Sequence, residues 1–384
     1  MKTAWALAGL IVLVGVIVWA SRCARWERVF RWFPVPLWCY ALPLLATALG
    51  WLPTHHSAYR HTTDLILPFA LALLLLGIDL PSLLSTGRSA LLAAVIGAAA
   101  IVVGAPLGVW ILHAHLPPDA WKGAGALAGT WTGGTMNLLA LRSLLDMPDA
   151  VFAPLIVVDA LMAYSWMALL VGASGFQEPM NRWLRADEIA VVSFAPTALN
   201  SDSSSHGSAQ AWCALIALGL AAGARMAGAH LPTSFLMSTA NGWTILLVTT
   251  ATLALSLIPW LRRIGAHGSA LGYPCLYLVL AATGAQADLN ALGSAPAWIG
   301  VGIVVVLLHG LTMLLAGRAL RIPLSVLATA SQANIGGLVS APLVGAVYHQ
   351  SLAPVGLLLA MAGNALGTYA GWGAASLSKY LLGG

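Results

Sequence analysis

GTWTGGTMN, residues 129–137, places three threonines and an asparagine around the glycine pair Gly133-Gly134 inside a long apolar run. A second interruption, SQANIGG at residues 331–337, carries its own pair, Gly336-Gly337. In hydrocarbon, a helix is broken only where protein or water satisfies the freed backbone groups. Two polar, glycine-broken segments in matching places of two halves of a membrane protein are typical of a transporter's binding site.

The composition is that of a membrane protein. Of the 384 residues, 60% are hydrophobic and only 8% are charged, whereas a soluble domain carries about 25% charged residues. Apolar runs near the length of a bilayer-spanning helix recur along the chain, which predicts an all-α polytopic membrane protein. The formal net charge of +5 does not indicate nucleic-acid binding, because the basic residues are scattered between apolar runs.

The chain divides into two halves with six hydrophobic segments each. A polar stretch with a serine-rich end, residues 175–209, predicts a linker between an N-terminal membrane repeat, 1–174, and a C-terminal one, 210–384. The predicted segments of the first half are 4–20, 35–51, 64–80, 89–112, 123–145 and 150–173. Those of the second half are 211–224, 243–260, 271–286, 295–320, 325–347 and 353–377.

An internal repeat supports this division. LALLLLGIDL (71–80) matches LVLAATGAQADL (278–289), and a glycine pair follows the glycine of this motif by 56 residues in the first half and by 52 in the second. Pro154 and Pro354 then follow the two pairs at similar distances. Three landmarks in the same order indicate that the halves share one structural plan.

The number of crossings decides the topology of the repeats. If every segment crosses the bilayer, the halves are parallel; if each glycine-broken segment dips in and returns, they are inverted. With the arginine-rich loop after the first segment inside, twelve crossings put seven of the seventeen Lys and Arg residues inside, and ten crossings put eleven there. Cytoplasmic loops are enriched in these residues. We therefore predict two inverted repeats of about five transmembrane helices, each with one re-entrant or discontinuous helix.

The broken segments form the predicted substrate site. A half-helix starting after each glycine pair would aim its free N–H groups and positive dipole end at mid-membrane, which suits an anionic group such as a carboxylate. The alternative is that small residues at these positions let helices pack tightly. The predicted substrate-binding residues are Thr130, Thr132, Gly133, Gly134, Thr135, Asn137, Gln332, Asn334, Gly336, Gly337 and Asn364.

Asp159 is the predicted ion-coupling residue. It lies deep in segment 150–173, where a carboxylate costs about 2.5–3.5 kcal/mol on insertion scales and marks a functional site. It would hold a coupling Na⁺ or exchange a proton; a structural hydrogen bond to a neighbouring helix is the alternative. The matching segment of the second half has no acid and offers Tyr369 as a second coupling residue. We predict no metal site and no cofactor besides a coupling Na⁺, because no Cys or acid is spaced to complete a site with the loop histidines.

These residues also carry a family resemblance. GTWTGGTMNLLAL, LAATGAQADL, NIGG (334–337) and LLAMAGNALGTYAGW together resemble the YjcL-like family of predicted integral membrane proteins, a domain of unknown function (819), over about residues 64–377. More distantly, the Gly-Gly segments resemble the re-entrant loops of glutamate:sodium and 2-hydroxycarboxylate:sodium symporters. By that analogy the two glycine pairs are the tips of two oppositely entering loops, and such folds often dimerise through their scaffold parts.

We therefore expect a secondary transporter that moves a small, anionic organic solute across a bacterial-type inner membrane by alternating access, coupled to Na⁺ or H⁺. A passive channel built on the same broken helices stays open as an alternative, as does a membrane subunit of a larger complex. An intramembrane enzyme acting on lipid-linked substrates is a further alternative; it would need a nucleophile or metal cluster that the sequence does not display, so our expectation is that the chain is not an enzyme.

Overall fold

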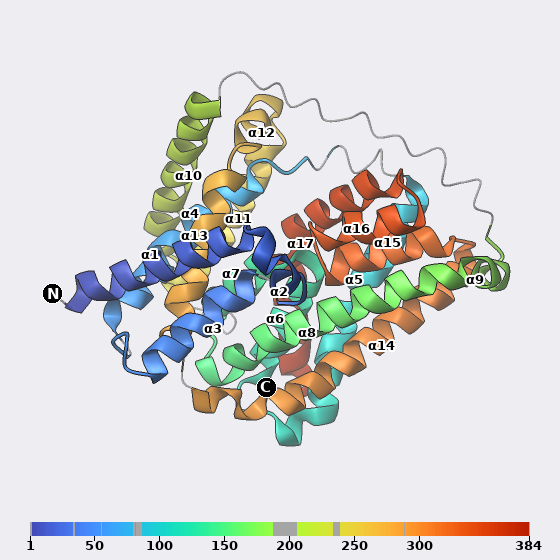
Figure 1. The fold of residues 1–384 in the computed structure, drawn as a ribbon, viewed down its shortest axis with the longest axis horizontal. Coiled ribbons are helices and arrows are strands. Elements are labelled where there is room, and N and C mark those ends of the chain that lie inside the picture. The colour runs from blue at the N-terminus through green and yellow to red at the C-terminus, as the bar shows by residue number, and fades with distance from the viewer. Residues whose placement is uncertain are drawn as a thin grey trace.

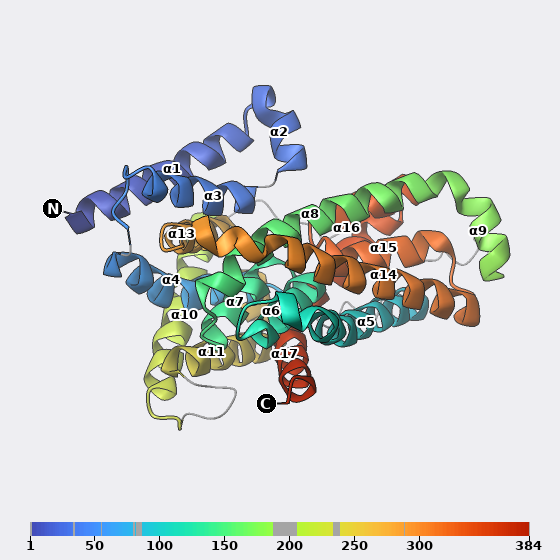
Figure 2. The same ribbon diagram turned by 90° about the horizontal axis from the view of Figure 1, so that it is seen from below.

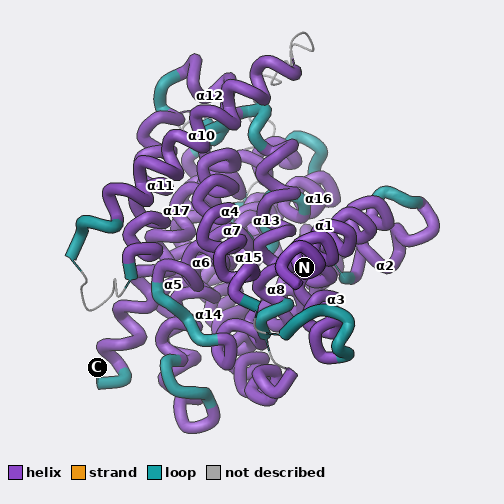
Figure 3. The backbone as a smooth tube through the Cα atoms, turned by 90° about the vertical axis from the view of Figure 1, so that its left-hand side faces the viewer, coloured by secondary structure: helices purple, strands orange, loops and turns teal. Residues whose placement is uncertain are grey.

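The computed structural model describes residues 2–33, 35–54, 56–79, 81, 87–186, 206–232, 239–287 and 289–383. In these residues the chain contains helices and loops but no strand, as Figure 3 shows. The predicted all-α class is therefore confirmed for the described part of the chain. Residues 187–205 of the predicted linker and Asp288 of the repeat motif lie outside the described residues.

The helices follow the predicted hydrophobic segments. In the first half they are α1 (Lys2–Ser21), α2 (Glu27–Trp32), α3 (Val35–Ala48), α4 (Ser57–Leu75), α5 (Arg88–Leu112), α6 (Ala120–Gly133), α7 (Thr135–Leu144), α8 (Asp149–Ala173) and α9 (Gln177–Leu184). In the second half they are α10 (His206–Gly228), α11 (Ala240–Ser256), α12 (Pro259–Gly265), α13 (Ser269–Gly284), α14 (Ala295–Leu320), α15 (Leu324–Ile335), α16 (Ser340–Tyr348) and α17 (Leu352–Leu381).

Among the described residues, length and composition make five helical segments candidates for crossing a membrane, or six if α11 and α12, bent by 117°, form one span. The five are Arg88–His115, Asp149–Leu184, Gly207–Gly228, Leu292–Leu320 and Leu352–Leu381. Three further apolar helices, Trp5–Ser21, Val35–Ala48 and Ser269–Gly284, are shorter. The chain is thus a polytopic helical protein, and the number of crossings per repeat stays a prediction.

The main boundary difference is at α4, which begins at Ser57 instead of residue 64. His56 caps this end, since its side chain accepts a hydrogen bond from the N–H of Ala58 at 3.2 Å. The hydroxyls of Thr62 and Thr63 bond back to carbonyls one turn earlier. The helix therefore starts in polar sequence, and the apolar run alone indicated too late a start.

The helices gather into two bundles (Figures 1 and 2). The α4/α13 bundle contains α1, α3, α4 and α10–α13, and the α6/α17 bundle contains α5–α9 and α14–α17. Contacts between them are made mainly by α7, which packs on α4 and α11, and by α8, which packs on α3. Each bundle takes helices from both halves of the sequence, so residues 1–174 and 210–384 are intertwined in space.

The packing of the two halves is reciprocal. Helix α4 packs on α13, α11 and α10, while α13 packs on α4, α3 and α1. In the other bundle α6 packs on α17 and α15 packs on α8. The repeat order pairs the first-half helices with second-half ones as follows: α1 with α10, α3 with α11, α4 with α13, α6 with α15 and α8 with α17. Exchanging the members of each pair turns one set of contacts into the other. This pattern follows the order of the sequence repeat.

Both glycine pairs lie where the chain folds back. Gly134, with φ of 79°, separates α6 from α7, and Gly337, with φ of 81°, lies between α15 and α16. Glycine adopts such a positive φ without the steric cost that other residues meet. After the first break α7 returns along α6, so that Leu141 lies over Gly129. A straight helix would hold these two residues about 18 Å apart, so the segment is a helical hairpin.

Helices α6 and α17 approach unusually closely. Glycines at every fourth position of α6 face glycines at every fourth position of α17: Gly125, Gly129 and Gly133 against Gly371, Gly367 and Gly363. A Cβ at Gly125 would lie 2.7 Å from the carbonyl oxygen of Gly371. Small residues at such spacing let backbones approach in membrane proteins. Tight packing therefore accounts for Gly133, the first glycine of its pair.

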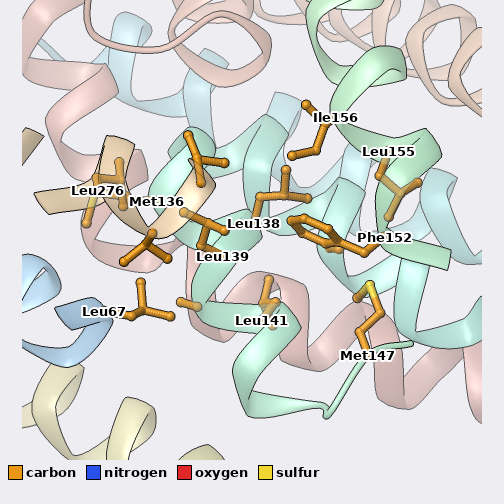
Figure 4. Packing of buried hydrophobic residues seen from close by; sticks show 14 of the residues in the cluster. Leu67, Met136, Leu138, Leu139, Leu141, Met147, Phe152, Leu155, Ile156 and Leu276 are labelled. Atoms are coloured by element: carbon orange, nitrogen blue, oxygen red, sulfur yellow. The ribbon is translucent and has the colours of Figure 1, made fainter. Parts of the chain in front are cut away.

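The apolar core continues across the junction of the bundles. Leu138 and Leu139 of α7 are buried, and Figure 4 shows them near Met136, with Leu67 of α4 and Leu276 of α13 beside them. The hairpin that carries the first glycine break is therefore packed between the bundles. Its break is held at the interface rather than at the outer surface.

Candidate functional site

A cavity of about 350 Å³ lies between the two bundles, at both glycine breaks. This volume falls in the range of small-molecule sites. The lining residues contributed by the α6/α17 bundle include Thr130, Gly134, Thr135, Asp159, Gly336, Gly337 and Asn364. Those contributed by α3 and α13 include Val35, Leu37, Tyr273, Leu276 and Tyr277. Two breaks that are about 200 residues apart in the sequence thus meet at one cavity.

Asp159 is the only charged residue among the described residues that line the cavity. It lies on α8, and its Oδ1 accepts a hydrogen bond from the hydroxyl of Thr130 at 3.2 Å. Thr130 lies one turn before Gly134 on α6, so this contact ties the carboxylate to the first break. An ionised carboxylate has about four acceptor positions, and Thr130 occupies one of them. Carboxylate oxygens are also the ligands that hard cations prefer.

The start of α7 forms the neighbouring part of the wall. Gly134 precedes the helix, and Thr135 and Met136, its first two residues, both line the cavity. The first N–H groups of a helix have no carbonyl partner within it. The N–H of Asn137 already bonds to the carbonyl of Gly134 at 2.9 Å, so the groups without a partner within the helix are those of Thr135 and Met136. This end of α7 therefore presents hydrogen-bond donors and a positive dipole end to the cavity that Asp159 also lines.

The second break contributes backbone rather than amide side chains. Gly336 and Gly337 line the cavity, but Gln332 and Asn334 are not among its lining residues. The Gln332 side chain donates to the Ser340 hydroxyl at 2.9 Å and so closes the α15–α16 hairpin. The Asn334 side chain donates to the carbonyl of Ala94 at 3.1 Å and fastens α15 to α5.

Asn137 and Thr132 are likewise occupied by structural hydrogen bonds. The Asn137 side chain donates to the Gly133 carbonyl at 2.6 Å and accepts from the Thr368 hydroxyl at 2.6 Å. It also donates to the backbone carbonyl of Asn364 at 3.3 Å, and in this way joins α7 to α17. The Thr132 hydroxyl donates to the Ala128 carbonyl one turn earlier. Neither side chain lines the cavity.

Tyr369 lies away from the cavity. Its hydroxyl shares a 2.7 Å hydrogen bond with the hydroxyl of Thr250 on α11, at a contact between the two bundles. It is not among the lining residues, so the structure does not bring Tyr369 and Asp159 to one cavity.

Arg142 also lies elsewhere, at the far end of α7. It forms an ion pair with Asp149 at 2.5 Å and stacks over the ring of Phe152. A separate polar pocket of about 230 Å³ surrounds it, lined also by Arg60, Asp64 and Asp146. Arg142 is therefore paired within the protein and does not reach the cavity at the glycine breaks.

Three tyrosines outside the predicted site line the cavity: Tyr164, Tyr273 and Tyr277. The rings of Tyr273 and Tyr277 lie one turn apart on α13, with centroids 6.3 Å apart and planes inclined by 32°. Their four-residue spacing was a signal in the sequence that one face of segment 271–286 is aromatic. Which surface that face meets could not be read from the spacing.

His309, a buried histidine in the middle of α14, was also missed. Its Nδ1 lies 3.0 Å from the Gly97 carbonyl and its Nε2 lies 2.8 Å from the Ser331 hydroxyl, which also accepts from the indole N–H of Trp166 at 2.8 Å. Because a carbonyl only accepts, Nδ1 carries the hydrogen, and Nε2 of the neutral ring accepts from Ser331. The ring thus connects α14 to α5 and, through Ser331, to α15 and α8.

Comparison with known proteins identifies the family. The sequence model of the family described as "Protein of unknown function (DUF819)" matches residues 8–381. The "Uncharacterized membrane protein YjcL" of Bacillus subtilis (strain 168) is 23% identical over 394 residues, and the alignment covers 96% of each chain. Both matches span the two glycine breaks and Asp159. Together with the apolar helices, they identify an integral membrane protein.

Proposed function

We propose that this chain, which belongs to the DUF819 family of proteins of unknown function, is an ion-coupled secondary transporter of a small, anionic organic solute that works by alternating access. One observation carries the proposal. A cavity between two bundles is lined by both glycine breaks and by one intramembrane carboxylate, Asp159. Broken helices that meet at a midpoint between repeats are the usual site of solute and ion in such transporters.

The proposal takes the two repeats to be inverted and the two hairpins to be re-entrant. Support comes from the reciprocal packing of α4 and α13 with their neighbours. Further support comes from the fold-back at each break, seen in the contact of Leu141 with Gly129 and in the hydrogen bond from Gln332 to Ser340. The distant resemblance to glutamate:sodium and 2-hydroxycarboxylate:sodium symporters belongs to the same proposal.

In this proposal the α6/α17 bundle carries the site and the α4/α13 bundle is the scaffold. The bundles are joined chiefly through α7 and α8, and in this proposal the bundles move relative to one another at these contacts. Such a movement would open the cavity to one side of the membrane and then to the other. The scaffold would also supply a dimer interface, and a bacterial-type inner membrane would be the location.

Asp159 would couple the ion to the solute through charge. A solute carboxylate bound at the start of α7 would share the cavity with the Asp159 carboxylate. Two like charges about 4 Å apart repel by roughly 4 kcal/mol at an effective dielectric constant of about 20. A Na⁺ ion or a proton on Asp159 removes this repulsion. Each ligand therefore favours binding of the other, which is the condition for coupled transport.

The test is uptake of labelled organic acids by proteoliposomes under imposed Na⁺ or proton gradients. We expect wild-type uptake to saturate and to require one of the two gradients. Asp159→Asn should abolish the dependence on the gradient, because the amide carries no charge for the ion to neutralise. Asp119→Asn is the matched control, since Asp119 lies at the surface in an ion pair with Lys122.

Three results would contradict parts of the proposal. Gradient-driven uptake that persists in Asp159→Asn would remove the coupling role. Uptake that ignores gradients and does not saturate would favour a passive channel. Copurifying partners required for any uptake would favour a membrane subunit of a larger complex.

A further inference from the structure

The cavity has two chemically different walls. The wall from the α6/α17 bundle carries Thr130, Thr135, Asp159 and Asn364 and the start of α7, set among apolar residues such as Met136, Ile156 and Ile335. The wall from α3 and α13 presents Val35, Leu37, Tyr273, Leu276 and Tyr277. Apart from the tyrosine hydroxyls, the polar side chains of the lining all come from one bundle, so a bound molecule can place a polar group on that side and an apolar body against the other.

The polar wall accommodates a single negative charge of the solute. No lysine or arginine is among the described residues that line the cavity, and Asp159 is itself an acid. A carboxylate can be held by the first N–H groups of α7, with the hydroxyl of Thr135 nearby. A second carboxylate would find no lysine or arginine among these residues and would share the cavity with the like charge of Asp159. Solutes with two or three carboxylates therefore fit this cavity poorly.

The other wall favours an apolar body. Tyr273 and Tyr277 present neighbouring rings inclined by only 32°, and Leu276, 3% exposed, fills the space beside them on α13. Aromatic side chains contribute favourable binding free energy by burying apolar area and by stacking on a second ring. A short, wholly polar solute would not bury apolar surface against this wall. It would therefore gain little binding free energy from the hydrophobic effect there.

We infer that the solute is an amphipathic monocarboxylate, with one carboxylate at the start of α7 and an aromatic or branched aliphatic body against Tyr273, Leu276 and Tyr277. The inference rests on the proposed transport function and names the solute class for the same cavity. It departs from the substrates that the symporter resemblance implies, which carry additional polar or charged groups.

Binding and transport are measured separately on the purified full-length protein. Phenylacetate and 4-methylpentanoate serve as monocarboxylate probes, and succinate and citrate serve as polycarboxylate probes. Equilibrium binding in detergent with saturating Na⁺, and in parallel at low pH, reports the solute class. Ion-driven uptake into proteoliposomes reports the proposed function. We expect both monocarboxylates to bind at least tenfold more tightly than succinate or citrate.

Variants of the apolar wall test the location of the site. Tyr277→Ala should weaken phenylacetate binding about tenfold, whereas Tyr277→Phe, which keeps the ring, should stay within about twofold of wild type. Tyr273→Ala supplies a second variant if Tyr277→Ala does not fold, and thermal unfolding reports folding for each. Tyr380→Ala is the matched control, because Tyr380 is 77% exposed at the end of α17.

The outcomes separate the two ideas. Tighter binding of succinate or citrate than of the monocarboxylates, or no monocarboxylate binding at millimolar concentration, would overturn the inferred class. Ion-driven succinate uptake in the first case would leave the transporter proposal standing. Tyr277-dependent monocarboxylate binding without ion-driven uptake would support the inferred ligand class and contradict the transporter proposal.

Discussion

The hydroxyl of Thr130 donates a hydrogen bond to the carboxylate of Asp159 across 3.2 Å. The contact joins α6, one turn before its glycine break, to α8, and it orients the only charged group among the described residues that line the cavity. A polar residue of the opening motif and the intramembrane acid, 29 residues apart in the sequence, therefore act as one unit.

We expect Thr130→Val to shift the half-saturating concentration of the coupling cation about tenfold: upward for Na⁺, because the carboxylate that binds it is no longer held in place, and downward for H⁺, because the lost hydrogen bond favours the ionised carboxylate. The substitution keeps the side-chain shape but removes the hydroxyl, and a hydrogen bond to a charged group is worth about 1.5–3 kcal/mol. A change of about 1.4 kcal/mol is tenfold in affinity. The measurement is the ion dependence of uptake. Thr130→Ser keeps the hydroxyl and should resemble wild type; an unchanged half-saturation in Thr130→Val would contradict the role.

A second prediction concerns Gly337, whose positive φ disfavours any residue with a Cβ. A Cβ at this position would meet no atom within 4 Å, so Gly337→Ala tests backbone strain without a clash. We expect a loss of roughly 1–2 kcal/mol of stability, measured as a lower thermal unfolding temperature in detergent. Gly223→Ala on α10 is the control: its Cβ is also free of contacts and its φ is not positive. Equal effects of the two substitutions would show that strain at the second break is unimportant.

A third prediction concerns the close packing of α6 on α17. A Cβ at Gly367 would lie 2.8 Å from the Gly129 carbonyl oxygen, whereas a Cβ at Gly373 on the same helix would have open space. Gly367→Ala should destabilise the protein by about 1–3 kcal/mol through overpacking, and Gly373→Ala should not. Chemical denaturation of the two variants under the same conditions measures the difference, and similar curves would argue against close packing of these helices.

A fourth prediction concerns the buried hydrogen bond between His309 and Ser331. Removal of either partner of a buried hydrogen bond leaves the other unsatisfied, at about 1–3 kcal/mol. We therefore expect His309→Leu and Ser331→Ala each to destabilise the fold. Their combined effect should be smaller than the sum, by at least about 0.5 kcal/mol, because they share one hydrogen bond. Free energies of unfolding for the two single variants and the double variant provide the test; strict additivity would exclude the contact between them.

Sequence reasoning found the helices well because its signal, hydropathy over a segment, is what a bilayer imposes on a spanning chain. It missed the start of α4, where His56 and backbone-bonded threonines continue the helix into polar sequence. Within the site, Asp159, Thr130, Thr135 and Asn364 line the cavity as a group. Asn137, Gln332 and Asn334, of the same polar types, are used to hold hairpins and helices together.

The sequence by itself determined the local properties: apolar segments long enough to be membrane helices, two glycine-marked breaks, and one carboxylate within an apolar run. Only the tertiary structure decided which polar groups face the cavity and which bond to backbone, because that depends on helices supplied by the other half of the chain. The same holds for Tyr273 and Tyr277, which reach the site only through the placement of α13 against the broken helices. Periodicity fixes which residues share a face of a helix, and packing decides what that face meets.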